Sequence, residues 1–194
     1  MEHWQSYLRG RVLEAFGRRE AAIKDYREAL RANPGFPRAA ARAAYLLSQL
    51  GRHDEAEAGF RRAMESEPGN AATHFNLGYT LDKCGRHEEA VAAFREATRL
   101  RPSLDRAWYG LGMAQAALGR HAEAATALHE AAALQPMNPH AWYALGMAHY
   151  ALGDTAKLKE VALHLVRFDP KMTRRLIRES GAAELDYLVR DLAA

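Results

Sequence analysis

The chain contains 194 residues, of which 48% are hydrophobic and 26% are charged, and its formal net charge at pH 7 is +3. A chain of this length and composition is expected to form one globular domain with a buried core. The charge is too small to indicate nucleic-acid binding, although it is uneven: residues 1–52 carry ten Lys or Arg against five Asp or Glu, residues 53–156 nine against thirteen, and residues 157–194 eight against six.

No segment is typical of a membrane span or a secretion signal. The uncharged stretch 136–153 is interrupted by Pro139 and by glycines, so we expect it to stay out of a membrane. Residues 1–10 lack the apolar core of a signal peptide, which favours a cytoplasmic protein. The single cysteine, Cys84, excludes an internal disulfide and a multi-cysteine metal site.

Proline and glycine both return at a constant interval of 34 residues. The prolines are Pro34, Pro68, Pro102, Pro136 and Pro170, and the glycines are Gly17, Gly51, Gly85, Gly119 and Gly153. An internal period of this length indicates an array of helical repeats.

Taken in chain order, the interval divides the sequence into five repeats, 3–36, 37–70, 71–104, 105–138 and 139–172, followed by a tail, 173–194. In each repeat we expect one helix over about positions 1–14 and a second over about positions 17–30. The glycine between them suits a left-handed helix end, and the acidic residues that follow it suit the positive end of the next helix dipole.

Small and large side chains alternate at fixed positions of the expected helices. Position 8 of the first helix is Gly or Ala in every repeat, and position 24 of the second is large in four of them: Tyr26, Phe60, Phe94 and Leu128. Such alternation lets antiparallel helices interlock. Repeat 5 inverts the order of the second helix, with Leu158, Ala162 and Leu165 at positions 20, 24 and 27.

This pattern resembles the tetratricopeptide repeat (TPR), and the match covers residues 3–172, including AWYGLG at 107–112 and AWYALG at 141–146. The resemblance implies an all-α fold, a right-handed α-solenoid of antiparallel helix pairs called the TPR superhelix. Terminal repeats are expected to be atypical, as Arg9 at position 7 of repeat 1 is. The tail carries two short apolar stripes and is expected to cap repeat 5 as a helix or helix pair; docking in a groove is the alternative.

No catalytic motif is complete in the sequence. Gly110 and Gly112 lack the third glycine of a dinucleotide-binding loop and lie inside a predicted helix. The histidines at position 17 (His53, His87 and His121) would stand about 8–10 Å apart in stacked repeats, too far to share a zinc ion. We therefore expect no enzymatic activity, no cofactor and no metal site.

The resemblance also implies a groove lined by the first helices, at positions 2, 5, 9 and 12, with position 6 at its border. The expected groove residues are Tyr7, Arg11, Arg38, Arg42, Tyr45, Phe75, Asn76, Tyr79, Arg106, Tyr109, Met113, His140, Tyr143 and Met147. Their types are enriched at the centres of protein interfaces. Tyr109 and Tyr143 are equally consistent with core packing, whereas Arg38, Arg42 and Arg106 are expected to meet an anionic ligand because clustered like charge otherwise costs stability.

Some TPR proteins grip the C-terminal carboxylate of chaperones with five Lys, Asn and Arg side chains. The matching positions here hold Ala41, Tyr45, Asn76, Arg106 and Gly110. Only two of the five fit, so a clamp of that type is not expected.

The sequence thus predicts a non-catalytic, cytoplasmic scaffold that binds a partner peptide or helix, with acidic and apolar residues, in its groove. Self-assembly into a homo-oligomer through an end helix, or service as the targeting domain of a larger complex, are the alternatives. Nucleic acid is disfavoured by the low net charge and the acidic middle of the array, although aromatic residues beside Arg can stack bases.

Overall fold

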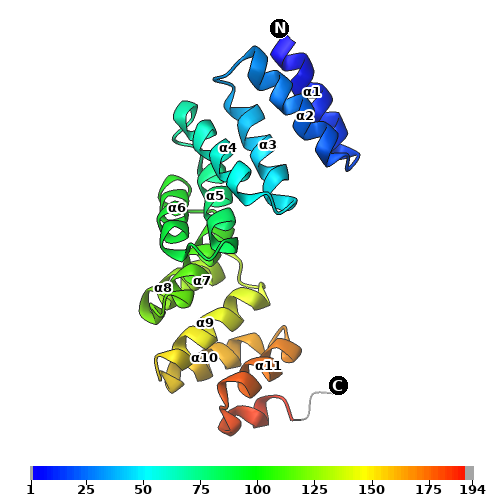
Figure 1. Ribbon diagram of the computed structural model, residues 1–194. Helices are drawn as coiled ribbons and strands as arrows, with labels where there is room; N and C mark the ends of the chain where they lie inside the picture. The colour runs from blue at the N-terminus through cyan, green and yellow to red at the C-terminus, as the bar shows by residue number, and fades with distance from the viewer. Residues whose placement is uncertain (1, 191–194) are drawn as a thin grey trace. The chain divides into compact units, whose positions relative to one another are not determined.

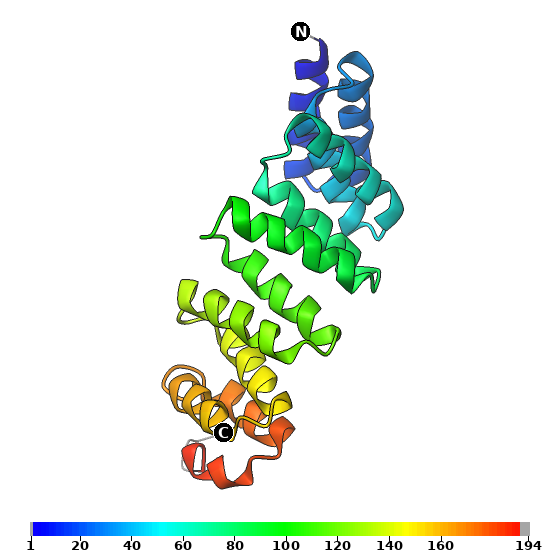
Figure 2. The ribbon, with the colours of Figure 1, turned by 90° about the vertical axis from the view of Figure 1, so that its left-hand side faces the viewer.

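The computed structural model describes residues 2–190, which form twelve helices and no strand (Figure 1). Ten of the helices form five consecutive antiparallel pairs, visible in both ribbon views (Figure 1, Figure 2). The pairs are α1 (Glu2–Ala15) with α2 (Arg19–Ala32), α3 (Pro37–Gln49) with α4 (His53–Ser66), α5 (Ala71–Lys83) with α6 (His87–Leu100), α7 (Asp105–Ala117) with α8 (His121–Leu134), and α9 (Pro139–Ala151) with α10 (Thr155–Leu165). They are followed by α11 (Pro170–Ser180) and a short 3-10 helix, η1 (Ala183–Leu188). The predicted all-α fold is confirmed, and the helices of the first four repeats lie within one residue of the positions predicted from the 34-residue interval.

The largest departure from the predicted bounds is at the end of repeat 5. The second helix there ends at Leu165, and α11 begins at Pro170, three residues before the predicted tail. Pro170 suits the first position of a helix, where no amide hydrogen bond is required. The Asp169 side chain caps this start by accepting a hydrogen bond from the backbone N of Met172 at 2.8 Å.

Each hairpin turns at its glycine as the sequence predicts. Gly17, Gly51, Gly85, Gly119 and Gly153 all have φ between 70° and 76°. Residues with a Cβ rarely adopt this left-handed conformation, so the glycine interval sets where each first helix ends.

The chain divides into two compact units, residues 1–101 with α1–α6 and residues 102–194 with α7–η1. In the first unit, the small residue at position 8 of a first helix meets the large residue at position 24 of its partner. A Cβ at Gly10 would lie 2.7 Å from Tyr26, and one at Gly78 would lie 2.9 Å from Phe94. Glycine is therefore required at both positions for the helices to approach this closely.

In the second unit, repeat 4 has the same contact between positions 8 and 24, whereas in repeat 5 a residue of another helix takes the place of position 24. In repeat 4, a Cβ at Gly112 would lie 2.5 Å from Leu128, the residue at position 24. In repeat 5 position 24 is Ala162, and the side chain nearest to Gly146 is Leu176 of α11, 2.8 Å from a Cβ placed there. Leu176 is fully buried, so α11 supplies the bulk that the inverted second helix lacks.

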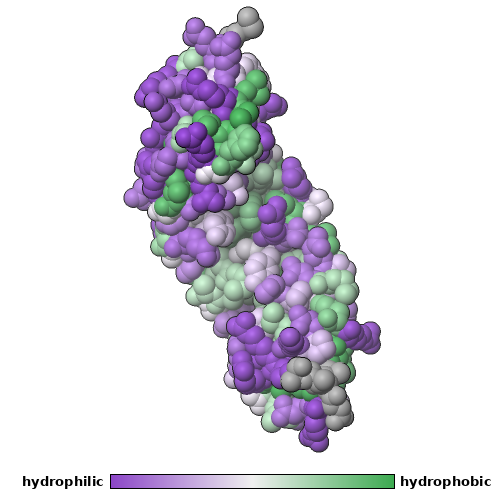
Figure 3. Space-filling view, turned by 90° about the vertical axis from the view of Figure 1, so that its right-hand side faces the viewer, coloured by the Kyte–Doolittle hydropathy of each residue, from purple (hydrophilic) through white to green (hydrophobic). Residues whose placement is uncertain are grey.

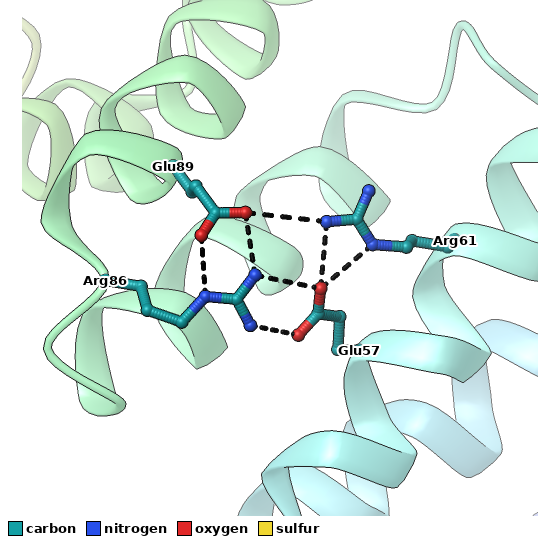
Figure 4. Close-up of polar contacts among 4 residues, drawn as sticks. All are labelled: Glu57, Arg61, Arg86 and Glu89. Atoms are coloured by element: carbon teal, nitrogen blue, oxygen red, sulfur yellow. Dashed lines mark hydrogen bonds and ion pairs between the residues drawn. The ribbon is translucent and has the colours of Figure 1, made fainter.

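Ion pairs join neighbouring second helices in the first unit. Figure 4 shows one group, in which Arg86 binds Glu57 of α4 at 2.5 Å and Glu89 of α6 at 2.7 Å, while Arg61 binds the same two carboxylates at 2.8 and 3.7 Å. One repeat earlier, Arg52 binds Glu20 and Glu55, and Arg27 binds Glu55 at 2.6 Å. We call this set the charge ladder; it uses arginines at positions 16 and 25 of the repeats.

None of the helices in residues 2–190 is long and apolar enough to cross a membrane. Within the same residues, no three His, Cys, Asp or Glu side chains are grouped so that they could hold a metal ion.

Candidate peptide-binding surfaces

Exposed large apolar side chains mark one side of the helix pairs. Within α3–α9, those that lie inside a helix rather than at its end are Tyr45, Tyr79, Met113 and Tyr150, with exposed fractions of 37, 48, 41 and 47%. All four belong to first helices, at position 9 or 12. The face drawn in Figure 3 likewise carries apolar patches that interrupt a largely hydrophilic surface. Apolar area left in water at repeated positions is typical of an interaction surface.

The first-unit arginines that are expected to contact an anionic ligand already have partners within that unit. The Arg42 guanidinium lies 3.1 Å from the Glu14 carboxylate, and Arg11 lies 3.8 Å from the same group. The Tyr26 hydroxyl donates to Glu14 at 2.5 Å, and burial together with this carboxylate raises the pKa of Tyr26. Glu14 therefore compensates the positive charge of Arg42, so the argument from clustered like charge does not hold for this residue, and its ligand role stays a prediction.

An aromatic cluster fills the start of the first unit. Tyr7 is only 7% exposed, and its ring packs against Trp4, Phe36 and Tyr26 with centroid distances of 5.1–5.7 Å. The Arg38 guanidinium lies 5.9 Å from the Trp4 ring centre, a cation–π contact. Tyr7 thus belongs to the core rather than to an accessible surface, and Arg38 also has a structural role.

The remaining first-unit candidates lie on two adjacent first helices, α3 and α5, whose hydroxyl oxygens Ser48 Oγ and Thr80 Oγ1 are 2.9 Å apart. Tyr45 and Tyr79 occupy the same repeat position on these helices and remain exposed. Phe75 and Asn76 are half-buried on α5. We call Tyr45, Tyr79, Phe75 and Asn76 the α3–α5 surface.

In the second unit, three of the predicted residues line one recess. The recess has a volume of about 230 Å³, and its walls include Arg106, Tyr109 and His140 together with Asp105 and Asn138. The Asn138 side chain accepts from the backbone N of His140 at 3.1 Å and so caps the start of α9. Burial raises the pKa of the Tyr109 hydroxyl. We call this recess, together with the exposed Met113 of α7, the α7–α9 surface.

Helix α11 covers the last predicted aromatic residue. The Tyr143 hydroxyl donates to the Glu179 carboxylate, and the Arg175 guanidinium lies 4.8 Å from the Tyr143 ring centre. Hydrogen bonds from Tyr143 and Arg175 lower the pKa of Glu179, so the carboxylate stays ionised. Met147 is half-buried against the core of this unit. The sequence does not reveal this cover, although Arg175 and Glu179 stand one helical turn apart.

A family model described as "Tetratricopeptide repeat" matches the sequence in four overlapping segments, residues 7–71, 43–105, 75–132 and 109–157. Among the curated proteins, no sequence matches the chain.

Solved structures of TPR proteins share the fold at low sequence identity. The crystal structure of YrrB, described as "a TPR protein with an unusual peptide-binding site", has 19% identity and a TM-score of 0.79, with 89% of this chain and 90% of that chain covered. A MamA crystal structure has 18% identity and a TM-score of 0.78, covering 95% and 96%. The PilF protein of Pseudomonas aeruginosa has 20% identity and a TM-score of 0.75, covering 98% and 93%.

Proposed function

The chain belongs to the tetratricopeptide repeat family of protein-interaction scaffolds, and we propose that it is a non-catalytic, cytoplasmic module that binds a peptide or helix of a partner protein on the exposed faces of its first helices. The observation that carries this proposal is the placement of Tyr45, Tyr79 and Met113. These side chains are 37–48% exposed at one repeat position, and the packing of the helix pairs does not use that exposed area.

The chemistry of the two surfaces suits a peptide with apolar and acidic residues. Tyrosine and methionine offer contact area at a low cost in conformational entropy, and methionine adapts to irregular shapes. Arg106 lines the α7–α9 recess, where its guanidinium can approach a partner carboxylate. The peptide-binding site ascribed to YrrB, a protein of the same fold, is consistent with this function.

The test uses a peptide selected from a displayed random library against the whole chain. Two variants remove one surface each: Tyr45→Ala with Tyr79→Ala, and Arg106→Glu with Met113→Ala. Leu163→Ala is the matched control, because Leu163 is 38% exposed on α10, a second helix. Binding is measured by fluorescence polarisation, and helicity by circular dichroism.

We expect at least one of the two surface variants to weaken binding by about tenfold or more, as loss of central interface residues does. The Leu163→Ala variant should bind like the unmodified chain. The proposal fails if both surface variants keep the affinity, or if the control alone loses it.

Self-assembly is the second candidate, and a specific feature of α1 favours it. Leu8, Val12 and Phe16 stand four residues apart along α1 and its C-terminal end, and their exposed fractions are 58, 56 and 79%. A stripe at this spacing can pack against another helix. Sedimentation of the chain and of its Val12→Lys variant over a range of concentrations tests this: a monomer at every concentration would rule self-assembly out.

A further inference from the structure

The charge ladder of the first unit has no counterpart between α8 and α10. Position 25, which is Arg27 and Arg61 in the first two repeats, is His129 on α8. Position 16, which is Arg52 and Arg86 in the ladder, is Asp154 before α10. Where α4 and α6 carry Glu55 and Glu89, α10 carries Lys157. The arginines that join neighbouring second helices elsewhere are therefore missing here.

A cavity occupies this place. Its volume is about 730 Å³, and it is lined by residues of α8, α9 and α10. Small side chains of α8, Ala122 and Ala125, leave the space open, and Leu145 and Val161 form an apolar part of the wall. Trp142 lines it as well, with its ring centre 4.0 Å from that of His164. The volume is within the range of ligand pockets, and the cavity is partly open to solvent.

His149, in the cavity wall, has a buried ring nitrogen without a partner. It is only 9% exposed, and its Nδ1 has no hydrogen bond. Position 11, which it occupies, is leucine in the first three repeats, so the fold does not require histidine there. The Nε2 of His164 is also buried and without a hydrogen bond. Buried polar atoms normally have partners, so two such atoms on one cavity point to a ligand that supplies them.

The ionisable groups around the cavity favour a cation. Glu130 and Glu160 line it, and the one lysine, Lys157, has its ammonium 3.6 Å from the Asp154 carboxylate. Burial is the main cause that lowers the pKa of His149; Lys157 and His129 lower it further, while Asp154 and Glu160 act against them. The imidazole is therefore neutral and can accept a hydrogen bond from a cationic donor.

We propose that this cavity binds the arginine side chain of a partner polypeptide, in the place where the charge ladder has its own arginines. A guanidinium offers five donors in a plane, which suits two carboxylates and neutral imidazole nitrogens, and it stacks on aromatic rings such as Trp142. Its aliphatic stem can lie along the alanines of α8. Lysine presents a point charge without the planar fork. This site is formed by α8, α9 and α10, and none of its lining residues belongs to the proposed peptide-binding surfaces, so it does not depend on them.

The experiment uses three capped pentapeptides added to the whole chain: Gly-Leu-Arg-Leu-Gly, the same peptide with citrulline in place of arginine, and the same peptide with lysine. Nuclear magnetic resonance reports on the Trp142 indole and on the imidazole rings of His149 and His164. We expect the arginine peptide to shift these signals and to bind about tenfold more tightly than either of the others. Equal binding of the citrulline or the lysine peptide would overturn the assignment.

Variants locate the site and separate binding from folding. Glu160→Gln should weaken arginine-peptide binding by about tenfold, while Glu123→Gln, an exposed control on α8 outside the cavity, should not change it. His149→Leu restores the residue of the first three repeats and should weaken binding while the helicity is kept. The double variant His129→Arg with Lys157→Glu restores an Arg–Glu pair of the charge ladder between α8 and α10, and this pair should prevent the peptide from binding. Unchanged binding in Glu160→Gln, or shifts confined to the α7–α9 surface, would refute the proposal.

Discussion

The contact between Gly146 and Leu176 gives a double-substitution test of how α11 is attached. In three other repeats, the residue at position 24 packs on the glycine at position 8, as Leu128 does on Gly112. In repeat 5, Ala162 leaves that place to Leu176. Leu176→Ala should therefore leave a hole at Gly146, and Ala162→Leu should be able to fill it from α10.

The size of the effect follows from the burial of Leu176, whose exposed fraction is 0%. Removing three carbons costs about 0.8 kcal/mol each in transfer free energy, and the remaining cavity adds to this. We expect Leu176→Ala to lower the free energy of unfolding by about 3 kcal/mol, within the range for buried leucines. Ala162→Leu alone should cost about 1–3 kcal/mol, because the added side chain competes with Leu176 for one space.

The two changes together should cost less than their sum. Urea unfolding followed by circular dichroism gives the free energies, and hydrogen exchange of the α11 amides shows whether the loss is local to this helix. We expect a favourable interaction energy of about 1–2 kcal/mol between the substitutions, as found for residues that share a cavity. Additive costs would show that Leu176 and position 24 do not substitute for one another, and the explanation of repeat 5 would fail.

Three further predictions concern buried polar groups and the charge ladder. Gln115→Leu should raise the free energy of unfolding by about 1 kcal/mol, because the Oε1 of this 5%-exposed side chain has no partner; a lower urea midpoint would contradict this. Arg86→Ala should destabilise the chain at low salt and near pH 7, and the loss should shrink at about 1 M salt and below about pH 4, where carboxylates are screened or protonated. The direction of this pH dependence follows from Glu57, because Arg86 is the main cause that lowers its pKa in the folded chain. The Glu57–Arg86 pair therefore stabilises the fold above the pKa of Glu57 in the unfolded chain, and this stabilisation disappears as the pH falls through the pKa of Glu57 in the folded chain. The pKa of His149 is lowered from its ordinary value of 6.5, so unfolding takes up a proton when the pH falls below that value, and the chain should lose stability. The His149→Leu variant should lack this loss of stability when urea titrations at pH 5 and pH 8 are compared.

Features that repeat locally could be predicted from the sequence, and features that join distant segments could not. The glycine interval places every hairpin turn, because a left-handed residue is a local requirement that glycine alone meets cheaply. The small Ala162 indicates that repeat 5 lacks bulk at position 24. It does not indicate that Leu176, from a helix outside the repeat pattern, supplies it.

The same distinction applies to the binding residues. Exposure of Tyr79 and Met113 follows from their repeat position, and both are exposed in the structure. The pairing of Arg42 with Glu14 joins residues 28 apart, at position 6 of one repeat and position 12 of the one before. A search of the sequence for opposite charges at position 6 of one repeat and position 12 of the repeat before identifies this ion pair, whereas inspection of one helix at a time does not.

The main helix contacts join elements that are at most two places apart in chain order, as in the packing of α11 on α9. An array of this kind closes only short loops when it forms, and no distant strand must find its partner. Mechanical tension applied to the ends should therefore peel helices away one hairpin after another, with many small steps in extension in place of a single rupture.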